Sequence, residues 1–289
     1  MKCLEAAKAQ LSRRDLLMGV LATTAVPLLA RNKASLQIGT MDTVLKLAGK
    51  PQAIQLAKAL DLAAVQVTLG VSADGKMLPL EDPELQRRYV NASEQHRIPI
   101  DSTYINMLHV SCLKSDPNAK KWVLKGIEIT KSLRAPILMT VFFGKCAVLN
   151  RTELDYVIDA FRDLISTAER AGVILGFENT LRGEDNRYAV DRIASAAFKI
   201  WYDVGNSTYN GYDVPAEIRM LGRERICQFH FKDKGYLGEG VVSYAPILKA
   251  IGDIEFKGYA NLETTSPSGD VEKDTRRNLA YLRNLMSTA

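Results

Sequence analysis

Hydrophobic and polar positions follow two alternating patterns from Leu36 onward. Short apolar runs alternate with longer amphipathic stretches. The short runs are rich in β-branched and aromatic residues, which favours strands. We predict eight strands, at Leu36–Met41, Ala64–Leu69, Ile100–Ile105, Ile137–Phe143, Val173–Asn179, Lys199–Val204, Ile226–Phe231 and Tyr259–Thr264.

The stretches between the predicted strands have the periodicity of helices that bury one face. Thr152–Ala171 is the clearest example, and Gly172 directly after it is typical of a helix end. Its apolar positions recur every three or four residues, at Leu154, Val157, Ile158, Phe161, Leu164 and Ile165. Lys121–Leu133 and Glu272–Met286 are predicted as helices on the same grounds.

The strict alternation of strands and helices predicts parallel strands joined by right-handed crossovers. Eight such units in a chain of this length match a closed (β/α)8 barrel. We therefore predict an α/β fold with a single TIM barrel domain over residues 35–289. A doubly wound sheet is the alternative, but no G-x-G-x-x-G motif follows the first predicted strand.

The charge of the chain is concentrated at its N-terminus. The formal net charge is +5 at pH 7, but residues 1–34 alone carry +4, so the predicted barrel is nearly neutral at +1. A neutral body lacks the basic surface that nucleic acids require. We therefore expect no nucleic-acid partner.

Cysteine and histidine usage excludes two further classes. The cysteines, at positions 3, 112, 146 and 227, do not form a disulfide framework, and none has the short spacing of a zinc knuckle. We expect Cys146 and Cys227 to be unpaired. The chain contains three histidines, which is too few for a histidine-rich centre with several metal ions.

The N-terminal segment, residues 1–34, has the pattern of an export signal. Arg13 and Arg14 precede a weakly polar run from Leu16 to Ala30, and the paired arginines resemble a twin-arginine signal. The run is shorter than the roughly 20 residues of a spanning helix and contains Pro27, so no stable membrane span is expected. We predict a periplasmic or exported protein, for which unphosphorylated sugars are the expected substrates. An ordinary amphipathic helix on a cytoplasmic protein is the alternative.

Four polar residues recur at one level of the predicted barrel. Glu178, Asp203, His230 and Glu263 lie at the ends of the last four predicted strands, about one βα unit apart. Functional side chains of such barrels lie at the C-terminal ends of the strands. A carboxylate in a strand interior is unfavourable unless a partner offsets its charge. We therefore expect the four side chains to form a functional site.

The alternation of side chains along a strand supports this interpretation. The residues two positions before the four are Gly176, Trp201, Gln228 and Asn261. The residues on the opposite face are Phe177, Tyr202, Phe229 and Leu262. The second set is bulky and suits packing under helices, whereas the first set predicts a wet barrel mouth.

Two glutamates, one aspartate and one histidine make an oxygen-rich site with one imidazole. Three carboxylates cannot all stay ionised at one point without a cation. The donor set suits one divalent metal ion. We expect Mn²⁺, with Co²⁺, Mg²⁺ or Zn²⁺ as alternatives.

Several short motifs make the sequence similar to a known family. They are Gly176-Phe-Glu178-Asn, Asp203-Val-Gly-Asn206, His230-Phe-Lys232-Asp233, Leu237-Gly-Glu-Gly-Val241 and Leu262-Glu263. Residues 36–286 resemble the xylose isomerase-like sugar phosphate isomerase/epimerase superfamily. The resemblance implies that Glu178, Asp203, His230 and Glu263 hold one metal ion. It also implies that Glu178 and Glu263 are the acid/base pair on opposite sides of a bound ketose.

The expected reaction is proton abstraction next to a carbonyl, through an enediolate, by a metal-dependent sugar isomerase or epimerase. Several ketose epimerases of this superfamily carry a second histidine where this chain has Asn206. The sequence therefore does not identify which sugar is the substrate. An exported lyase or isomerase of 3-keto-glycosides with the same metal site is one alternative, and a catalytically silent sugar-binding barrel is another. A zinc endonuclease of the same superfamily is excluded by the small number of histidines.

Further residues near the predicted strand ends are candidates for substrate contacts. They are His109, Asn179, Asn206, Lys232 and Arg182. For Lys232 an ion pair with Asp233 that closes the loop is the alternative. The expected partner is a small sugar or keto-sugar, and a homodimer is possible for a barrel of this type.

Overall fold

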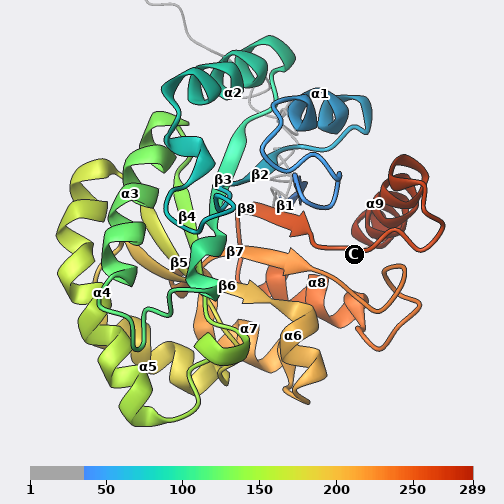
Figure 1. The fold of residues 1–289 in the computed structure, drawn as a ribbon. Helices are drawn as coiled ribbons and strands as arrows, with labels where there is room; N and C mark the ends of the chain where they lie inside the picture. The colour runs from blue at the N-terminus through green and yellow to red at the C-terminus, as the bar shows by residue number, and fades with distance from the viewer. Residues whose placement is uncertain (1–35, 289) are drawn as a thin grey trace, which may run out of the picture. The chain divides into compact units, whose positions relative to one another are not determined.

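The computed structural model describes residues 36–288, and these residues form a closed barrel of eight parallel strands (Figure 1). The strands are β1 (Leu36–Met41), β2 (Val65–Thr68), β3 (Ile100–Ile105), β4 (Ile137–Val141), β5 (Ile174–Glu178), β6 (Phe198–Asp203), β7 (Ile226–Phe231) and β8 (Gly258–Leu262). They pair in chain order, and β1 closes the ring against β8. The predicted fold class is confirmed, and each predicted strand overlaps an observed one.

Helices follow the strands and lie outside the ring (Figure 1). They are α1 (Gln52–Ala59), α2 (Pro83–His96), α3 (Ala119–Ser132), α4 (Arg151–Ala171), α5 (Gly183–Ile193), α6 (Val204–Tyr209), α7 (Val214–Arg225), α8 (Tyr244–Asp253) and α9 (Val271–Thr288). Three short 3-10 helices lie in the loops: η1 (Pro79–Glu81), η2 (Asn106–His109) and η3 (Gly144–Cys146). No helix within residues 36–288 combines the length and the apolar character needed to cross a membrane.

The longest predicted helix forms as its sequence indicates. The Asn150 side chain caps α4 by accepting a hydrogen bond from the Glu153 backbone N–H, and Gly172 ends the helix with a φ of 70°. Phe161 on its buried face packs against aromatic rings of the sheet, including Phe177 on the outward face of β5. The bulky outward set thus fills the layer between strands and helices, as predicted.

An irregularity between β2 and β3 affects the interior next to the site. Between β2 and β3, Val65 pairs with Ile100, but Gln66 pairs with Ser102, so β3 carries one extra residue, Asp101. This is a β-bulge. The bulge lets two successive residues, Asp101 and Ser102, lie on the inner side of β3.

The N-terminal segment predicted as an export signal, residues 1–34, lies outside the described residues. Export, the alternative cytoplasmic location and the domain boundary at residue 35 therefore stay predictions.

Candidate active site

The four residues predicted to share a site come together at the C-terminal rim of the barrel. Glu178, Asp203, His230 and Glu263 each offer one ligand atom, and these atoms lie within 4.8 Å of one another. The first three end or nearly end β5, β6 and β7, and Glu263 directly follows β8. Glu178, Asp203 and His230 are buried, whereas Glu263 is partly exposed to the open rim.

His230 is the hub of the cluster. Its Nδ1 lies 2.8 Å from Glu178 Oε1 and 3.2 Å from Glu263 Oε2. Its Nε2 faces Gln66 Oε1 at 3.1 Å. Burial lowers the pKa of His230, but the charges of Glu178 and Glu263 outweigh burial and raise the pKa to about 10. One nitrogen thus faces two carboxylates while an amide oxygen holds the other.

Asp203 is fixed by the helix that begins after it. Its Oδ1 accepts a hydrogen bond of 2.8 Å from the Asn206 backbone N–H and so caps α6. Its Oδ2 lies 2.7 Å from the Lys232 ammonium, which is also 2.9 Å from Glu263 Oε2. Burial and the neighbouring charge of Glu263 raise the pKa of Asp203 to about 7. Positive charge, here from Lys232, opposes this shift.

Lys232 does not pair with Asp233, which was the alternative for this lysine. The Asp233 carboxylate instead accepts backbone N–H groups from Lys234, Gly240, Val241 and Val242. It therefore closes the loop after β7 from within. Lys232 is left to face the acidic cluster.

A cavity of about 240 Å³ opens next to the four residues. Its lining consists of Met41, Tyr104, His109, Met139, Val141, Phe143, Glu178, Asn206, His230, Lys232 and Glu263. His109 Nε2 and the Tyr104 hydroxyl share a hydrogen bond of 2.5 Å. Burial lowers the pKa of His109, although Glu178 and Glu263 oppose this shift. The cavity lining therefore combines polar groups, among them Glu178, Tyr104 and His109, with apolar side chains.

The five predicted substrate contacts separate into two groups. His109, Asn206 and Lys232 line the cavity. Asn179 does not: its amide donates to Asn186 Oδ1, and its carbonyl oxygen accepts from the Leu181 N–H. Arg182 also lies outside the lining, with its guanidinium over the Tyr212 ring at 5.1 Å.

The prediction of a wet barrel mouth for the inner residues is wrong. Trp201, Gln228 and Asn261 are almost completely inaccessible. Asp101 accepts hydrogen bonds from Gln228 Nε2 at 2.8 Å and Asn261 Nδ2 at 3.4 Å. The barrel interior at this level is filled by a closed polar layer because the bulge in β3 turns Asp101 inward. Burial raises the pKa of Asp101 to about 7.

Sequence reasoning missed several residues of the site. Tyr104 lies near the end of β3 and Phe143 lies in the loop after β4, but in the sequence each resembles an ordinary aromatic strand residue. Gln66 and Asp101 lie inside predicted strands. A single polar residue in a strand does not reveal which face of the strand its side chain occupies. The position of Tyr104 near the end of the third predicted strand is the one available signal.

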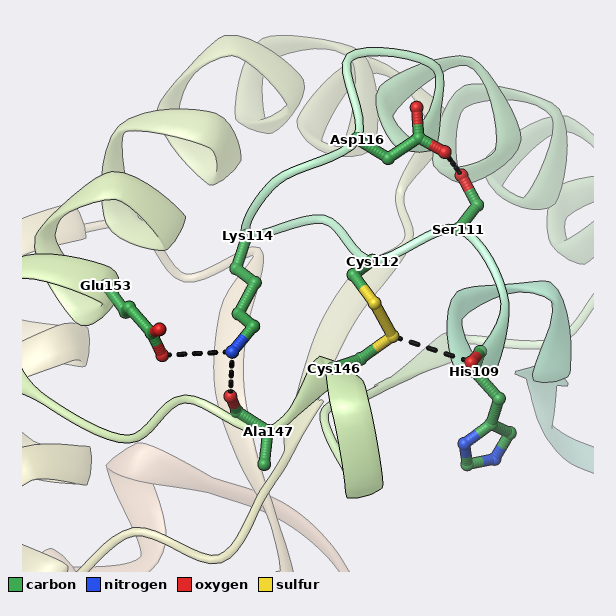
Figure 2. The surroundings of a disulfide bond; sticks show 8 residues. All are labelled: His109, Ser111, Cys112, Lys114, Asp116, Cys146, Ala147 and Glu153. Atoms are coloured by element: carbon green, nitrogen blue, oxygen red, sulfur yellow. Dashed lines mark hydrogen bonds and ion pairs between the residues drawn. A yellow bond between two sulfur atoms is a disulfide. The ribbon is translucent and has the colours of Figure 1, made fainter.

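The expectation that Cys146 is unpaired is also wrong. Cys112 and Cys146 form a disulfide with their Cα atoms 4.9 Å apart (Figure 2). The two cysteines lie 34 positions apart and meet because the loops after β3 and β4 are neighbours at the rim. Cys227 is unpaired, as expected.

Comparison with known proteins agrees with this fold. The family profile described as xylose isomerase-like TIM barrel matches residues 54–285. The chain belongs to this family. The 2-epi-5-epi-valiolone 7-phosphate 2-epimerase of Actinoplanes sp. is 25% identical over 185 residues, which cover 63% of this chain and 67% of the relative.

Solved structures share the fold at low sequence identity. The D-allulose 3-epimerase from Methylomonas sp. in complex with D-allulose aligns with a TM-score of 0.70 at 14% identity, covering 86% of this chain and 97% of that one. The 3-keto-D-glucoside 4-epimerase from E. coli, in its apo form, aligns with a TM-score of 0.68 at 14% identity, covering 86% of this chain and all of that one (100%). These relatives are all epimerases by name.

Proposed function

We propose that the protein is a metal-dependent carbohydrate isomerase or epimerase that removes a proton next to a carbonyl. The observation that carries the proposal is the convergence of Glu178, Asp203, His230 and Glu263, whose ligand atoms lie within 4.8 Å of one another beside a cavity. Membership of the xylose isomerase-like family and the epimerase relatives support the same reaction class.

The donor set fits one divalent ion. Three carboxylates and one imidazole are ligands that ions of intermediate hardness accept. Burial, together with the charge of Glu263, raises the pKa of Asp203 to about 7, and a bound cation would favour the ionised carboxylate. Glu178, Asp203, His230 and Glu263 would hold the ion, and Mn²⁺ is the ion we propose. When bound, it would polarise a carbonyl oxygen and offset the charge of a developing enediolate.

Glu178 and Glu263 are the proposed acid/base pair. Their nearest oxygens reach the same His230 nitrogen from two strands, at 2.8 and 3.2 Å. A carboxylate oxygen of one would take the proton from the carbon beside the carbonyl. Return of a proton to the same carbon by the counterpart on the opposite face gives epimerisation. Return of the proton to the neighbouring carbon by the first carboxyl, with a proton moved between the two substrate oxygens, gives isomerisation. The partly exposed position of Glu263 suits contact with substrate.

The proposed substrate is an unphosphorylated sugar. Lys232 is the one lysine or arginine among the described residues that line the cavity, and two carboxylates already hold its ammonium. A phosphate would find no free cationic partner there. Apolar side chains such as Met139 and Phe143 suit the C–H faces of a sugar, and Tyr104, His109 and Asn206 offer hydrogen bonds to hydroxyls.

A 3-keto-glycoside is the second candidate substrate. Asn206 replaces a histidine expected of several ketose 3-epimerases and lines the cavity. The fold similarity to a 3-keto-D-glucoside 4-epimerase makes this substrate class a reasonable comparison. A lyase acting on such a substrate would use the same proton abstraction.

We also propose that the protein is exported. The Cys112–Cys146 disulfide supports this location, because disulfides persist in oxidising compartments. The test is fractionation of cells that produce the parent chain or the Arg13→Lys/Arg14→Lys variant. Retention of the variant alone in the cytoplasm is expected, and an identical distribution of both contradicts export. A homodimer stays a prediction, to be tested by the mass of the protein in solution.

The test of the reaction begins with elemental analysis of the full chain expressed without added metal. About one divalent ion per chain is expected. Ketoses and 3-keto-glycosides are then incubated with the Mn²⁺-loaded protein in D₂O, and exchange of a carbon-bound hydrogen is measured by NMR. Glu178→Gln and Glu263→Gln are expected to slow exchange about 100-fold or more. Glu239→Gln, at an exposed glutamate paired with Arg277, is the matched control.

Two outcomes would contradict the proposal. A protein that binds no metal and gains no thermal stability with Mn²⁺ would favour a silent sugar-binding barrel. A metal-binding protein that exchanges no hydrogen in any member of a broad panel would retain the site but not the reaction.

A further inference from the structure

Three side chains form one side of the cavity, which we call the mouth wall: Tyr104, His109 and Phe143. The His109 ring lies edge-on to the Tyr104 ring at 6.0 Å between centroids, and 6.2 Å from the Phe143 ring. Tyr104 belongs to β3, His109 to η2 after it, and Phe143 to the loop after β4. The wall therefore depends on how two loops sit against each other.

The disulfide joins these two loops next to His109 (Figure 2). Cys112 follows η2, and Cys146 ends η3. Cys146 Sγ lies 3.5 Å from the His109 carbonyl oxygen. Because a disulfide sulfur carries no hydrogen, this is a packing contact, and it places the cross-link against the backbone of a wall residue.

A second, non-covalent contact joins the same loops. Lys114 Nζ donates a hydrogen bond of 2.6 Å to the Ala147 carbonyl oxygen and lies 3.1 Å from Glu153 Oε2 (Figure 2). The Lys114 side chain is only 13% exposed. The two loops are thus held by one covalent bond and one charge-assisted hydrogen bond, and the ion pair with Glu153 ties the first loop to α4.

We propose that the Cys112–Cys146 disulfide is a positioning element for substrate binding, which keeps His109 and Phe143 in place at the mouth of the cavity. The inference rests on the proposed function for its substrate. The candidate metal ligands come from β5 to β8, whereas the mouth wall comes from β3, β4 and their loops. Loss of the disulfide is therefore expected to weaken sugar binding and to leave metal binding unchanged.

The test compares the full-length parent with the Cys112→Ser/Cys146→Ser variant, and the parent before and after dithiothreitol. In the reduction, the disulfide takes two electrons and two protons from dithiothreitol, which becomes its cyclic disulfide. Hydrogen exchange of residues 106–118 and 142–150 is expected to become about tenfold faster, because loss of a constraint favours local opening. Calorimetric titration with Mn²⁺ is expected to give the same affinity within about twofold.

Turnover supplies the third readout. With a sugar that the parent converts, KM is expected to rise about three- to tenfold with a smaller change in kcat, as for a loss of preorganised binding contacts. Dithiothreitol added to the double variant is the control and should change none of these values. Reduction of the folded parent keeps the test valid if the double variant does not fold.

The outcomes distinguish this inference from the proposed function. Two free thiols at positions 112 and 146 under oxidising conditions, or unchanged loop exchange after reduction, would overturn it. An unchanged KM would also overturn it. Hydrogen exchange and Mn²⁺ titration need no turnover, so a protein that converts no sugar still shows whether the disulfide holds the two loops.

Discussion

Gln66 accepts a hydrogen bond from His230, with 3.1 Å between Gln66 Oε1 and His230 Nε2. The amide of Gln66 is itself oriented, because its Nε2 lies 3.4 Å from the Met139 sulfur, a weak acceptor. The amide oxygen therefore points at the histidine. This arrangement keeps a proton on Nε2 and leaves Nδ1 as the nitrogen that faces Glu178 and Glu263.

The first prediction follows from this pair. Gln66→Met removes the acceptor and keeps much of the side-chain volume, so His230 loses the partner that fixes its tautomer. We expect the affinity for Mn²⁺ to fall about 10-fold or more. Calorimetric titration measures the affinity, and nitrogen NMR of the protein loaded with diamagnetic Mg²⁺ reports which His230 nitrogen carries the proton. Gln55→Met, at an exposed position on α1, is the control. An unchanged tautomer and affinity would exclude this role for Gln66.

The second prediction concerns Lys232. Its ammonium lies between Asp203 and Glu263, and Asp203 is fully buried. In Lys232→Met two carboxylates lose their cation, and we expect the metal-free protein to lose about 3 kcal/mol of unfolding free energy. Added Mn²⁺ is expected to recover most of the loss, because a bound cation replaces the missing charge.

Denaturant unfolding with and without Mn²⁺ measures this effect. Lys249→Met is the matched control, since its ion pair with Asp253 is exposed and is expected to contribute less than about 1 kcal/mol. Equal losses in the two variants would show that the Lys232 contacts have no special weight.

The third prediction is a pH dependence of stability from Asp101. Burial raises its folded pKa to about 7 from 3.8. The folded state therefore keeps a proton that the unfolded state releases. Stability from this group is full below about pH 4 and falls as the pH rises to about 7, by up to roughly 4 kcal/mol.

Asp101→Asn removes this titration. Its amide can donate to Gln228 Oε1 once the Gln228 amide turns over, and that oxygen is buried and accepts no hydrogen bond in the parent. We expect the variant to gain stability relative to the parent between pH 4 and pH 7. Unfolding free energies across this range, taken as a difference between the two proteins, check the sign. A flat difference would mean that Asp101 ionises freely in the fold.

The fourth prediction concerns the loop after β7. A Cβ at Gly240 would lie 1.9 Å from Asp233 Oδ1, the carboxylate that holds the loop. Gly240→Ala is expected to destabilise the protein by about 1–3 kcal/mol. Gly252→Ala, on α8 with no atom within 4 Å, is the control and should be neutral or slightly stabilising. Thermal unfolding compares the two, and equal midpoints would contradict the expected clash.

The sequence was sufficient to predict the barrel and the convergence of the four polar residues. Strands of a TIM barrel carry β-branched and aromatic residues on the buried outer face, so their positions are visible in the pattern. Glu178, Asp203 and His230 lie at or next to the ends of consecutive strands, and Asp203 pairs in register with His230. The residue pattern along the chain was enough for these features because each depends only on one strand and its neighbour.

Features that depend on distant parts of the chain could not be predicted. The Cys112–Cys146 pair forms across 34 positions because two loops meet in space, and spacing alone carries no such information. Asn179 resembled a substrate ligand, but its side chain stabilises the turn before α5 through Asn186 and Leu181. The inner polar layer depends on Asp101, whose direction is set by a bulge that leaves no mark in the sequence.

The extra residue in β3 affects how the sequences of relatives must be aligned with this chain. Asp101 and Ser102 both point inward. The alternation of inward and outward side chains along β3 is therefore shifted by one residue after the bulge. A relative with one residue fewer in this strand keeps Tyr104 at the rim only if its alignment gap falls at the bulge. With the gap placed anywhere else, a comparison matches interior side chains to exterior ones and misjudges which sugar contacts the two proteins share.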